Sequence, residues 1–258
     1  MDTQAVAWRI LQQRMGRYTD GGPSLGAAGS ARYRMEAGRL RVAYATARPG
    51  HTGELVEGVV RYARMRRAQV QWTVTPTRSG EEQLTPALLA AGFEAIECLL
   101  LMAHEGPIGS AVNPRVEVRR IASWQEMWEY EVGSRQSFYD DLRPSDALVS
   151  QRATERWREH ERGWCHYYKA LLGGRHAGGC YVSLFEDVPT IMGVYTLREA
   201  RRQGVATALL ARTVRDLLPR ENGLCCLFVE DGNPAERLYR RLGFMPLFES
   251  NTYNWTLL

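Results

Sequence analysis

The chain has 258 residues, of which 45% are hydrophobic and 24% are charged, a composition typical of soluble globular proteins with a complete core. This length suits one large domain or two smaller ones, and we favour two. No segment approaches the roughly 18 to 20 uninterrupted apolar residues of a membrane span, and the first residues lack a signal-peptide pattern. We therefore expect a cytoplasmic protein that has no membrane partner.

The positive charge is scattered along the chain. The net charge is +4, and arginine supplies nearly all of the cationic groups, since Lys169 is the only lysine. Scattered arginines indicate solvated helix faces, so we expect no nucleic-acid partner. The five cysteines lack Cys-x-x-Cys spacing, and His160, His166 and His176 lack the spacing of metal ligands. We expect buried thiols, no disulfide and no metal.

In the first part of the chain, strand-like and helix-like runs alternate. The predicted order is strand, helix, strand, helix and strand, over residues 40–46, 54–67, 70–76, 81–91 and 94–102. Gly, Pro, Ser and Asn cluster at residues 106–114, which is typical of a linker. We therefore expect two domains, at residues 1–110 and 111–258.

The second part begins with a strand at residues 116–121, and two helices follow. Ser123 and Glu126 form a capping-box pattern at the start of the first helix, and the second covers residues 145–162. Gly173 and Gly174 separate two β-rich runs, at 165–172 and 177–185, and predict a hairpin. The remaining elements are a strand at 189–197, a helix at 204–218, a strand at 224–229, a helix at 234–242 and strands at 246–249 and 252–257.

The two halves have the pattern of a tandem duplication. A shift of 151 residues without gaps places Tyr44 on Tyr195, Gly53 on Gly204 and Phe93 on Phe244. The five elements of the first half then fall on elements of the same type in the second half.

A basic turn with a glycine joins the strand at 189–197 to the next helix. Its sequence is Arg201-Arg-Gln-Gly-Val-Ala206. A strand that runs through such a turn into a helix exposes backbone N–H groups at the positive end of the helix dipole, which suits a pyrophosphate. The sequence therefore predicts a phosphorylated cofactor.

This turn and a second segment resemble the GNAT superfamily of acyl-CoA-dependent N-acyltransferases. The pyrophosphate loop of that family reads Arg/Gln-x-x-Gly-x-Gly/Ala, and its second segment reads roughly Asn-x-x-Ala-x-x-Leu-Tyr-x-x-x-Gly-Phe. The matching residues here are Arg201, Gly204 and Ala206, and then Ala235, Leu238, Tyr239, Gly243 and Phe244. The usual asparagine is replaced by Gly232, and Asn233 stands one place late. The resemblance covers the chain from Val116 onward.

The resemblance implies an α/β (α+β) fold with a mixed, mostly antiparallel central sheet flanked by helices, here in tandem. It also implies an N-acetyltransferase in residues 111–258 that moves an acetyl group from acetyl-CoA to a primary amine of a small molecule or amino acid by direct attack. Residues 1–110 would be a degenerate, structural copy, because Arg201, Ala206 and Tyr239 fall on Gly50, Leu55 and Leu88. The chain would be a monomer with pseudo-dimeric halves or a homodimer.

The resemblance also assigns cofactor contacts. Backbone groups of Val194 and Thr196 would bind the pantetheine arm and the thioester oxygen, and N–H groups of the turn and of the first helical turn would bind the pyrophosphate. The full expected set is Val194, Thr196, Arg201, Arg202, Gln203, Gly204, Val205, Ala206, Thr207, Asn233 and Tyr239.

Tyr239 is the candidate general acid, because a phenol with a pKa near 10 is protonated at neutral pH. Packing in the core is its alternative role. Glu230 is the candidate base, with Asp231 beside it, and a water molecule is the alternative. Glu186 and Asp187 are expected to be solvated, and Tyr195 either lines the acceptor pocket or packs.

The acceptor is the least determined part of the site. Residues 136–144 would shape its pocket, and Asp140 and Asp141 there either attract a cationic amine or have a capping or solvated role. Two alternatives to the small-molecule enzyme remain: a protein or peptide N-acetyltransferase, and a non-catalytic acyl-CoA-binding module. The sequence does not separate acetyl from longer acyl donors.

Overall fold

The computed structural model of the chain describes residues 2, 5–7, 9–10, 28–36, 38–74, 83–139, 144–184, 188–220 and 223–256, which form two compact units. The N-terminal unit comprises Asp2–Leu101, Val229–Asn233 and Pro246–Leu258. The C-terminal unit comprises Met102–Phe228 and Pro234–Met245. This division differs from the expected continuous domains 1–110 and 111–258, because two short stretches of the second half of the chain belong to the N-terminal unit.

The sheet of the N-terminal unit has the strand order β1-β2-β3-β10-β4. Its strands are β1 (Gly29–Glu36), β2 (Arg39–Ala47), β3 (Gln69–Val74), β10 (Met245–Trp255) and β4 (Glu94–His104). β2 and β3 are parallel, whereas β1 pairs with β2 and β10 with β3 in the antiparallel sense. The sequence did not predict β1, and it predicted two short terminal strands where the structure has the single strand β10.

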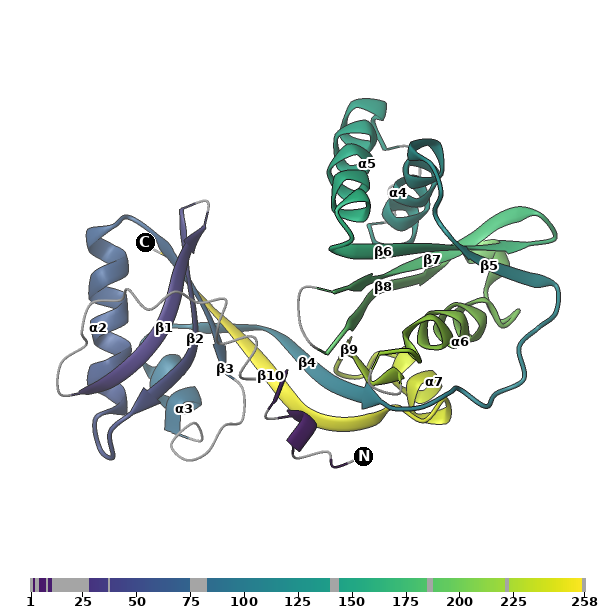
Figure 1. Ribbon diagram of the computed structural model, residues 1–258. Coiled ribbons are helices and arrows are strands. Elements are labelled where there is room, and N and C mark those ends of the chain that lie inside the picture. The colour runs from purple at the N-terminus through teal and green to yellow at the C-terminus, as the bar shows by residue number, and fades with distance from the viewer. Residues whose placement is uncertain are drawn as a thin grey trace. The chain divides into compact units, whose positions relative to one another are not determined.

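Two helices, α2 (Thr52–Met65) and α3 (Leu84–Ala90), pack on this sheet (Figure 1). The apolar residues of α2 recur at three- and four-residue steps, so one face of the helix is buried. Leu55 of α2 and Leu88 of α3 are fully buried, in a core that includes Trp72, Phe93 and Trp255. Because Tyr253 and Trp255 belong to β10, the last strand supplies part of the core of the N-terminal unit.

The C-terminal unit has the strand order β9-β8-β7-β6-β5. The strands are β5 (Val116–Arg120), β6 (Cys165–Leu172), β7 (Arg175–Ser183), β8 (Thr190–Thr196) and β9 (Cys225–Glu230). Neighbouring strands are antiparallel except for the parallel pair of β8 and β9. The predicted hairpin is confirmed, with Gly173 and Gly174 at positive φ between β6 and β7. The expected mixed, mostly antiparallel sheet is therefore confirmed.

Helices cover both faces of this sheet (Figure 1). α4 (Trp124–Phe138) and α5 (Asp146–Glu161) lie on one face, and α6 (Val205–Leu217) and α7 (Ala235–Arg241) lie on the other. The cap of α4 is confirmed: the Ser123 hydroxyl accepts a hydrogen bond of 3.3 Å from the N–H of Glu126. The Glu126 carboxylate accepts from the N–H of Ala122 at 2.9 Å, one residue before the usual partner in a capping box.

The repeat predicted from the sequence recurs in the element order β2-α2-β3-α3-β4 and β8-α6-β9-α7-β10. The shift of 151 residues holds without error for α3 against α7 and for β4 against β10. It fails for β3, which begins at Gln69, because its counterpart β9 begins at Cys225, 156 residues later. A longer connection between α6 and β9 accounts for this difference.

Among the described residues, no helix is both long enough and apolar enough to cross a lipid bilayer.

Candidate active site

Strands β8 and β9 separate after a short paired segment. Thr190 lies opposite Cys226 and Ile191 opposite Leu227. Beyond Ile191, β8 continues to Thr196 without a β9 partner in the part of the chain that the structure describes. Backbone polar groups need a hydrogen-bonding partner when they are covered, so this edge of β8 is open to a ligand. Val194 and Thr196, expected from the sequence to bind the cofactor through their backbone, lie in this open segment.

A β-bulge interrupts β8 at the same place. Tyr195 lies opposite Gly179 and Met192 opposite Tyr181, so that Gly193 and Val194 together face the single residue between those two on β7. Gly193 has a φ of 58°, and a Cβ there would lie 3.2 Å from the Tyr181 ring. The strand predicted at residues 189–197 is found at Thr190–Thr196. The sequence did not predict the bulge, because a bulge depends on the partner strand as well as on the glycine.

Tyr195 packs against α4. Its side chain is 3% exposed, and its hydroxyl donates a hydrogen bond of 2.9 Å to the backbone carbonyl of Tyr130. The His176 Nε2 atom lies 3.2 Å from the same hydroxyl. Of the two roles considered for Tyr195, packing is therefore the one found.

The start of α6 is open to an anion. The chain leaves β8 through a short 3-10 helix at Arg198–Ala200, and then turns through Arg202 at a φ of 60° and Gly204 at a φ of 78°. Gly204 is the N-cap, so the cap residue has no side chain that could accept from the first N–H groups of the helix. These N–H groups lack acceptors within the helix and lie at the positive end of its dipole. The turn is therefore suited to an anion such as a pyrophosphate.

Asn113 supports this turn, although the sequence placed it in a linker. Its side-chain N–H donates a hydrogen bond of 2.9 Å to the backbone carbonyl of Gln203, and its Oδ1 accepts from the N–H of Arg115 at 3.0 Å. A Cβ on Gly204 would lie 3.3 Å from the Cβ of Asn113. Residues 90 positions apart in sequence thus meet here, and no local sequence signal announces such a contact.

A cavity of about 310 Å³ lies at this turn. The residues that line it come from the end of β8, from the turn, from the first residues of α6 and from α7: Thr196, Arg201, Arg202, Gly204, Val205, Ala206, Thr207, Leu238 and Arg241. The first seven were assigned to the cofactor from the sequence. The side chain of Gln203, also assigned, donates instead to the Glu199 carbonyl at 3.0 Å. Arg241 is a lining residue that the sequence interpretation missed.

Tyr239 lies on α7 and is 6% exposed. Its ring is 6.0 Å from that of Phe244, and its hydroxyl has no hydrogen-bond partner among the described residues. Burial, and secondarily the nearby Cys180, raises the pKa of Tyr239 to about 12. The hydroxyl therefore keeps its proton at neutral pH, as a general acid requires.

Glu230 and Asn233 form a turn at the end of β9. The N–H of Asn233 donates to the carbonyl of Glu230 at 3.1 Å, and the side chain of Glu230 is exposed. Both residues belong to the N-terminal unit, whereas the cavity is built from the C-terminal unit alone. Asp140, Asp141, Glu186 and Asp187 lie outside the described residues.

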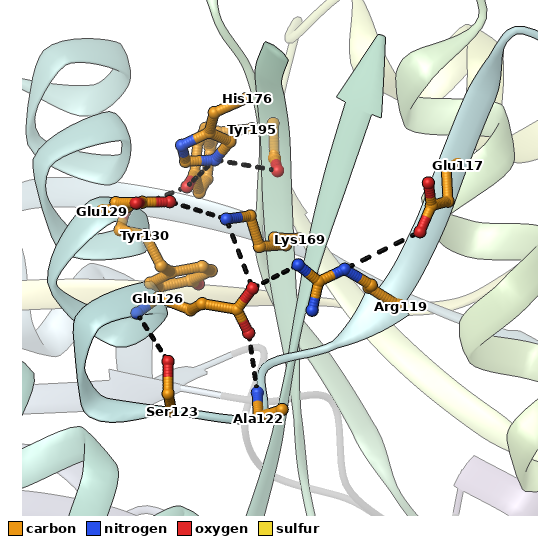
Figure 2. A network of polar contacts seen from close by, with 11 residues as sticks. Glu117, Arg119, Ala122, Ser123, Glu126, Glu129, Tyr130, Lys169, His176 and Tyr195 are labelled. Carbon is orange, nitrogen blue, oxygen red and sulfur yellow. Dashed lines mark hydrogen bonds and ion pairs between the residues drawn. The ribbon is translucent and has the colours of Figure 1, made fainter. Parts of the chain in front are cut away.

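An ion-pair network fixes α4 to the sheet (Figure 2). Lys169 of β6, 4% exposed, donates to a Glu129 oxygen at 2.6 Å and lies 3.7 Å from an oxygen of Glu126. Arg119 of β5 pairs with the same Glu126 oxygen. Burial opposes ionisation of Glu126, but the Ala122 N–H, Arg119 and Lys169 hold its pKa below the usual value. Each buried charge thus has a partner, as a stable buried network needs.

The described residues contain no group of three or more His, Cys, Asp or Glu side chains arranged to hold a metal ion. His160 and His176 instead contact backbone carbonyls, at 3.2 Å to Cys165 and 3.2 Å to Gly178.

The mixed sheet with its diverging β8 and β9, followed by the open start of α6, agrees with the fold that the family resemblance implied. The profile of the acetyltransferase (GNAT) family matches residues 124–244, and this part of the chain is a domain of that family. The family resemblance noted from the sequence is therefore confirmed. A comparison with curated protein sequences found no match.

Solved structures with the same fold cover both units. A GCN5-related N-acetyltransferase from Kribbella flavida is 17% identical, with a TM-score of 0.67 over 98% of this chain and 95% of that one. One from Sphaerobacter thermophilus is 18% identical, with a TM-score of 0.68 over 98% and 92%. A tandem GNAT protein from the clavulanic acid biosynthesis pathway is 16% identical, with a TM-score of 0.63 over 88% and 78%. At these identities the similarity establishes the fold.

Proposed function

We propose that the C-terminal unit is an N-acetyltransferase that moves an acetyl group from acetyl-CoA to a primary amine of a small molecule or amino acid by direct attack. The observation that carries this proposal is the cavity of about 310 Å³ where the open edge of β8 meets the uncapped start of α6. Uncapped N–H groups and arginines around one cavity suit a pyrophosphate. Acetyl-CoA supplies the acyl group as an activated thioester.

The residues assigned from the sequence have the following proposed roles, whether or not they line the cavity. Gly204 and the N–H groups of Val205 to Thr207 hold the pyrophosphate, because Gly204 adopts its positive φ at little cost. Backbone groups of Val194 and Thr196, on the open edge of β8, hold the pantetheine arm. Tyr239 donates its proton to the departing sulfur, and Glu230, directly or through water, accepts the proton of the amine.

The N-terminal unit is proposed to carry no second donor site. At the positions of Ala206 and Tyr239 the first repeat has Leu55 and Leu88, and both leucines are 0% exposed in the core of that unit. A side chain buried in this way supplies packing energy and cannot contact a ligand.

The test is an assay of thiol release from acetyl-CoA with amines, amino acids, aminoglycosides and short peptides as acceptors. Turnover with a small amine supports the proposal, whereas turnover with peptides alone would favour a peptide N-acetyltransferase. Tight binding of CoA without turnover on any acceptor would favour a binding module. Longer acyl-CoA donors in the same assay define the acyl group.

A further inference from the structure

Two neighbouring arginines on α7 have different surroundings. Arg240 donates from Nε to a Glu236 oxygen at 2.7 Å, one helical turn earlier. Arg241 lines the cavity at the start of α6. Among the described residues, its guanidinium has no hydrogen bond or ion pair. Arg241 is therefore a cation at the cavity wall that pairs with no carboxylate in the part of the chain that the structure describes.

The charge of the cavity favours an anion. Three of its nine lining residues are arginines, Arg201, Arg202 and Arg241, and none is acidic. The Arg201 Nε donates to the carbonyl of Thr196 at 3.4 Å, so this side chain is turned toward the end of β8. Arginine binds phosphate oxygens through parallel N–H donors, and such charge-assisted hydrogen bonds are the strong ones.

The first repeat provides an internal comparison. Because α3 and α7 correspond residue by residue, Ala90 stands where the second repeat has Arg241. The cavity between α2 and α3, of about 470 Å³, includes Ala90, and its two arginines, Arg61 and Arg64, come from α2. The short helix thus carries a cavity-lining arginine in the second repeat, on α7, and none in the first, on α3.

We infer that Arg241 binds the pyrophosphate of the donor from α7 while the N–H groups of α6 bind it from the turn. This inference rests on the proposed function. Arg241 lies two residues after Tyr239, so a phosphate bound by Arg241 also holds in place the helix that carries the proton donor.

The test compares Arg241→Ala with Arg240→Ala in the full chain by calorimetric titration with CoA, dephospho-CoA and pantetheine. We expect Arg241→Ala to weaken CoA and dephospho-CoA by the same factor, about 10-fold, since a hydrogen bond to a charged group contributes that much. Pantetheine, which has no phosphate, should bind both variants and the wild type equally. Arg240→Ala should stay within about twofold of the wild type, because an exposed ion pair contributes little.

Unchanged affinity of Arg241→Ala for CoA would overturn this inference and leave the proposed function intact. A loss with CoA but not with dephospho-CoA would also overturn it, because the contact would then be to the 3′-phosphate. Failure of the wild type to bind CoA would overturn the proposed function as well. Arg241→Lys, which keeps the charge, should recover part of the affinity, and thermal melts identify any variant that is misfolded.

Discussion

The side chain of Asn113 donates a hydrogen bond of 2.9 Å to the backbone carbonyl of Gln203, one residue before the N-cap of α6. It therefore holds the turn from a distant segment of the chain. Arg202 and Gly204 both have positive φ in this turn, and such a conformation persists only when its surroundings support it.

Replacing Asn113 by Ala should weaken CoA binding about 3- to 10-fold, because the net contribution of one hydrogen bond is of that order. The melting temperature should change little, since Asn113 is partly exposed. Calorimetric titration and thermal melts check the two expectations. Equal affinity for CoA in the variant and the wild type would show that the turn holds its shape without Asn113.

Replacing Gly204 by Val should abolish the CoA site. Gly204 has a φ of 78°, which a β-branched residue adopts only with strain, and its Cβ would lie 3.3 Å from Asn113. The matched control is Gly53→Val, at the corresponding position of the first repeat, where nothing lies within 4 Å of a Cβ and φ is ordinary. The control should bind one CoA per chain, as the wild type should. Two comparable sites per chain would contradict a structural role for the N-terminal unit.

Replacing Tyr239 by Phe keeps the ring against Phe244 but removes the proton. Turnover should fall by about 10² to 10⁴, the usual effect of losing a positioned general acid, while CoA affinity and melting temperature stay nearly constant. Steady-state kinetics and melts on the same variant separate this result from a packing role. A lower melting temperature with unchanged turnover would make Tyr239 a structural residue.

The pH dependence of the wild type gives a second check on Tyr239. Its pKa is raised to about 12, so it stays protonated well beyond pH 10, and an alkaline fall in turnover below that point must come from another group. Because the folded pKa exceeds the unfolded value, the associated stability is present below pH 10 and is lost as the pH rises toward 12. The loss should be smaller in Tyr239→Phe.

Replacing Lys169 by Met should destabilise the C-terminal unit by about 1 to 3 kcal/mol, because it removes the cation that Glu129 accepts from at 2.6 Å and leaves Glu126 with Arg119 alone. The control is Glu155→Gln, which removes an exposed pair with Arg152 and should cost less than about 0.5 kcal/mol. Urea unfolding measures both. Equal stability of the Lys169 variant and the control would mean that the network is not needed to hold α4.

Acid should weaken the same network through Glu126. Its folded pKa is lowered, so the stability it contributes is present above its unfolded value, near 4.5, and is lost as the pH falls through the folded value. The free energies of unfolding of the wild type and of Glu126→Gln, measured with urea between about pH 3 and 7, should therefore converge at the acid end. A constant difference across this range would contradict the role of Glu126.

A fragment of residues 112–258 should aggregate. It would contain β10 without its partner β3, so the unpaired strand edge and the side chains of Tyr253 and Trp255, which are buried in the full chain, would be exposed. An unpaired strand edge is a template for association. Size-exclusion chromatography measures the outcome. A soluble and fully active fragment would show that the N-terminal unit is dispensable.

Local patterns in the sequence predicted the local features of the structure. The Ser123 cap, the Gly173-Gly174 hairpin and the turn before α6 each depend on residues close together in the chain, and all three were found. The family resemblance assigned to the cofactor seven of the nine residues that line the cavity.

The features that the sequence did not predict depend on distant partners. Asn113 meets Gln203, Arg241 meets the turn before α6, and the bulge at Gly193 forms against β7. The division of the chain was also missed, since β10 pairs with β3 in a register that hydrophobic periodicity does not encode. Pairing partners of strands are a property of the whole fold.

The pairing of β10 with β3 also has a consequence for synthesis on the ribosome. β3 has β2 on one side and β10 on the other. The residues of β10 that pair with β3, 251–255, are translated long after α2, α3 and β4 are complete. At about 5 to 20 residues per second, the half-built sheet waits on the order of ten seconds or more with that edge unpaired. We therefore expect the nascent first half to need protection from association until β10 has been synthesised.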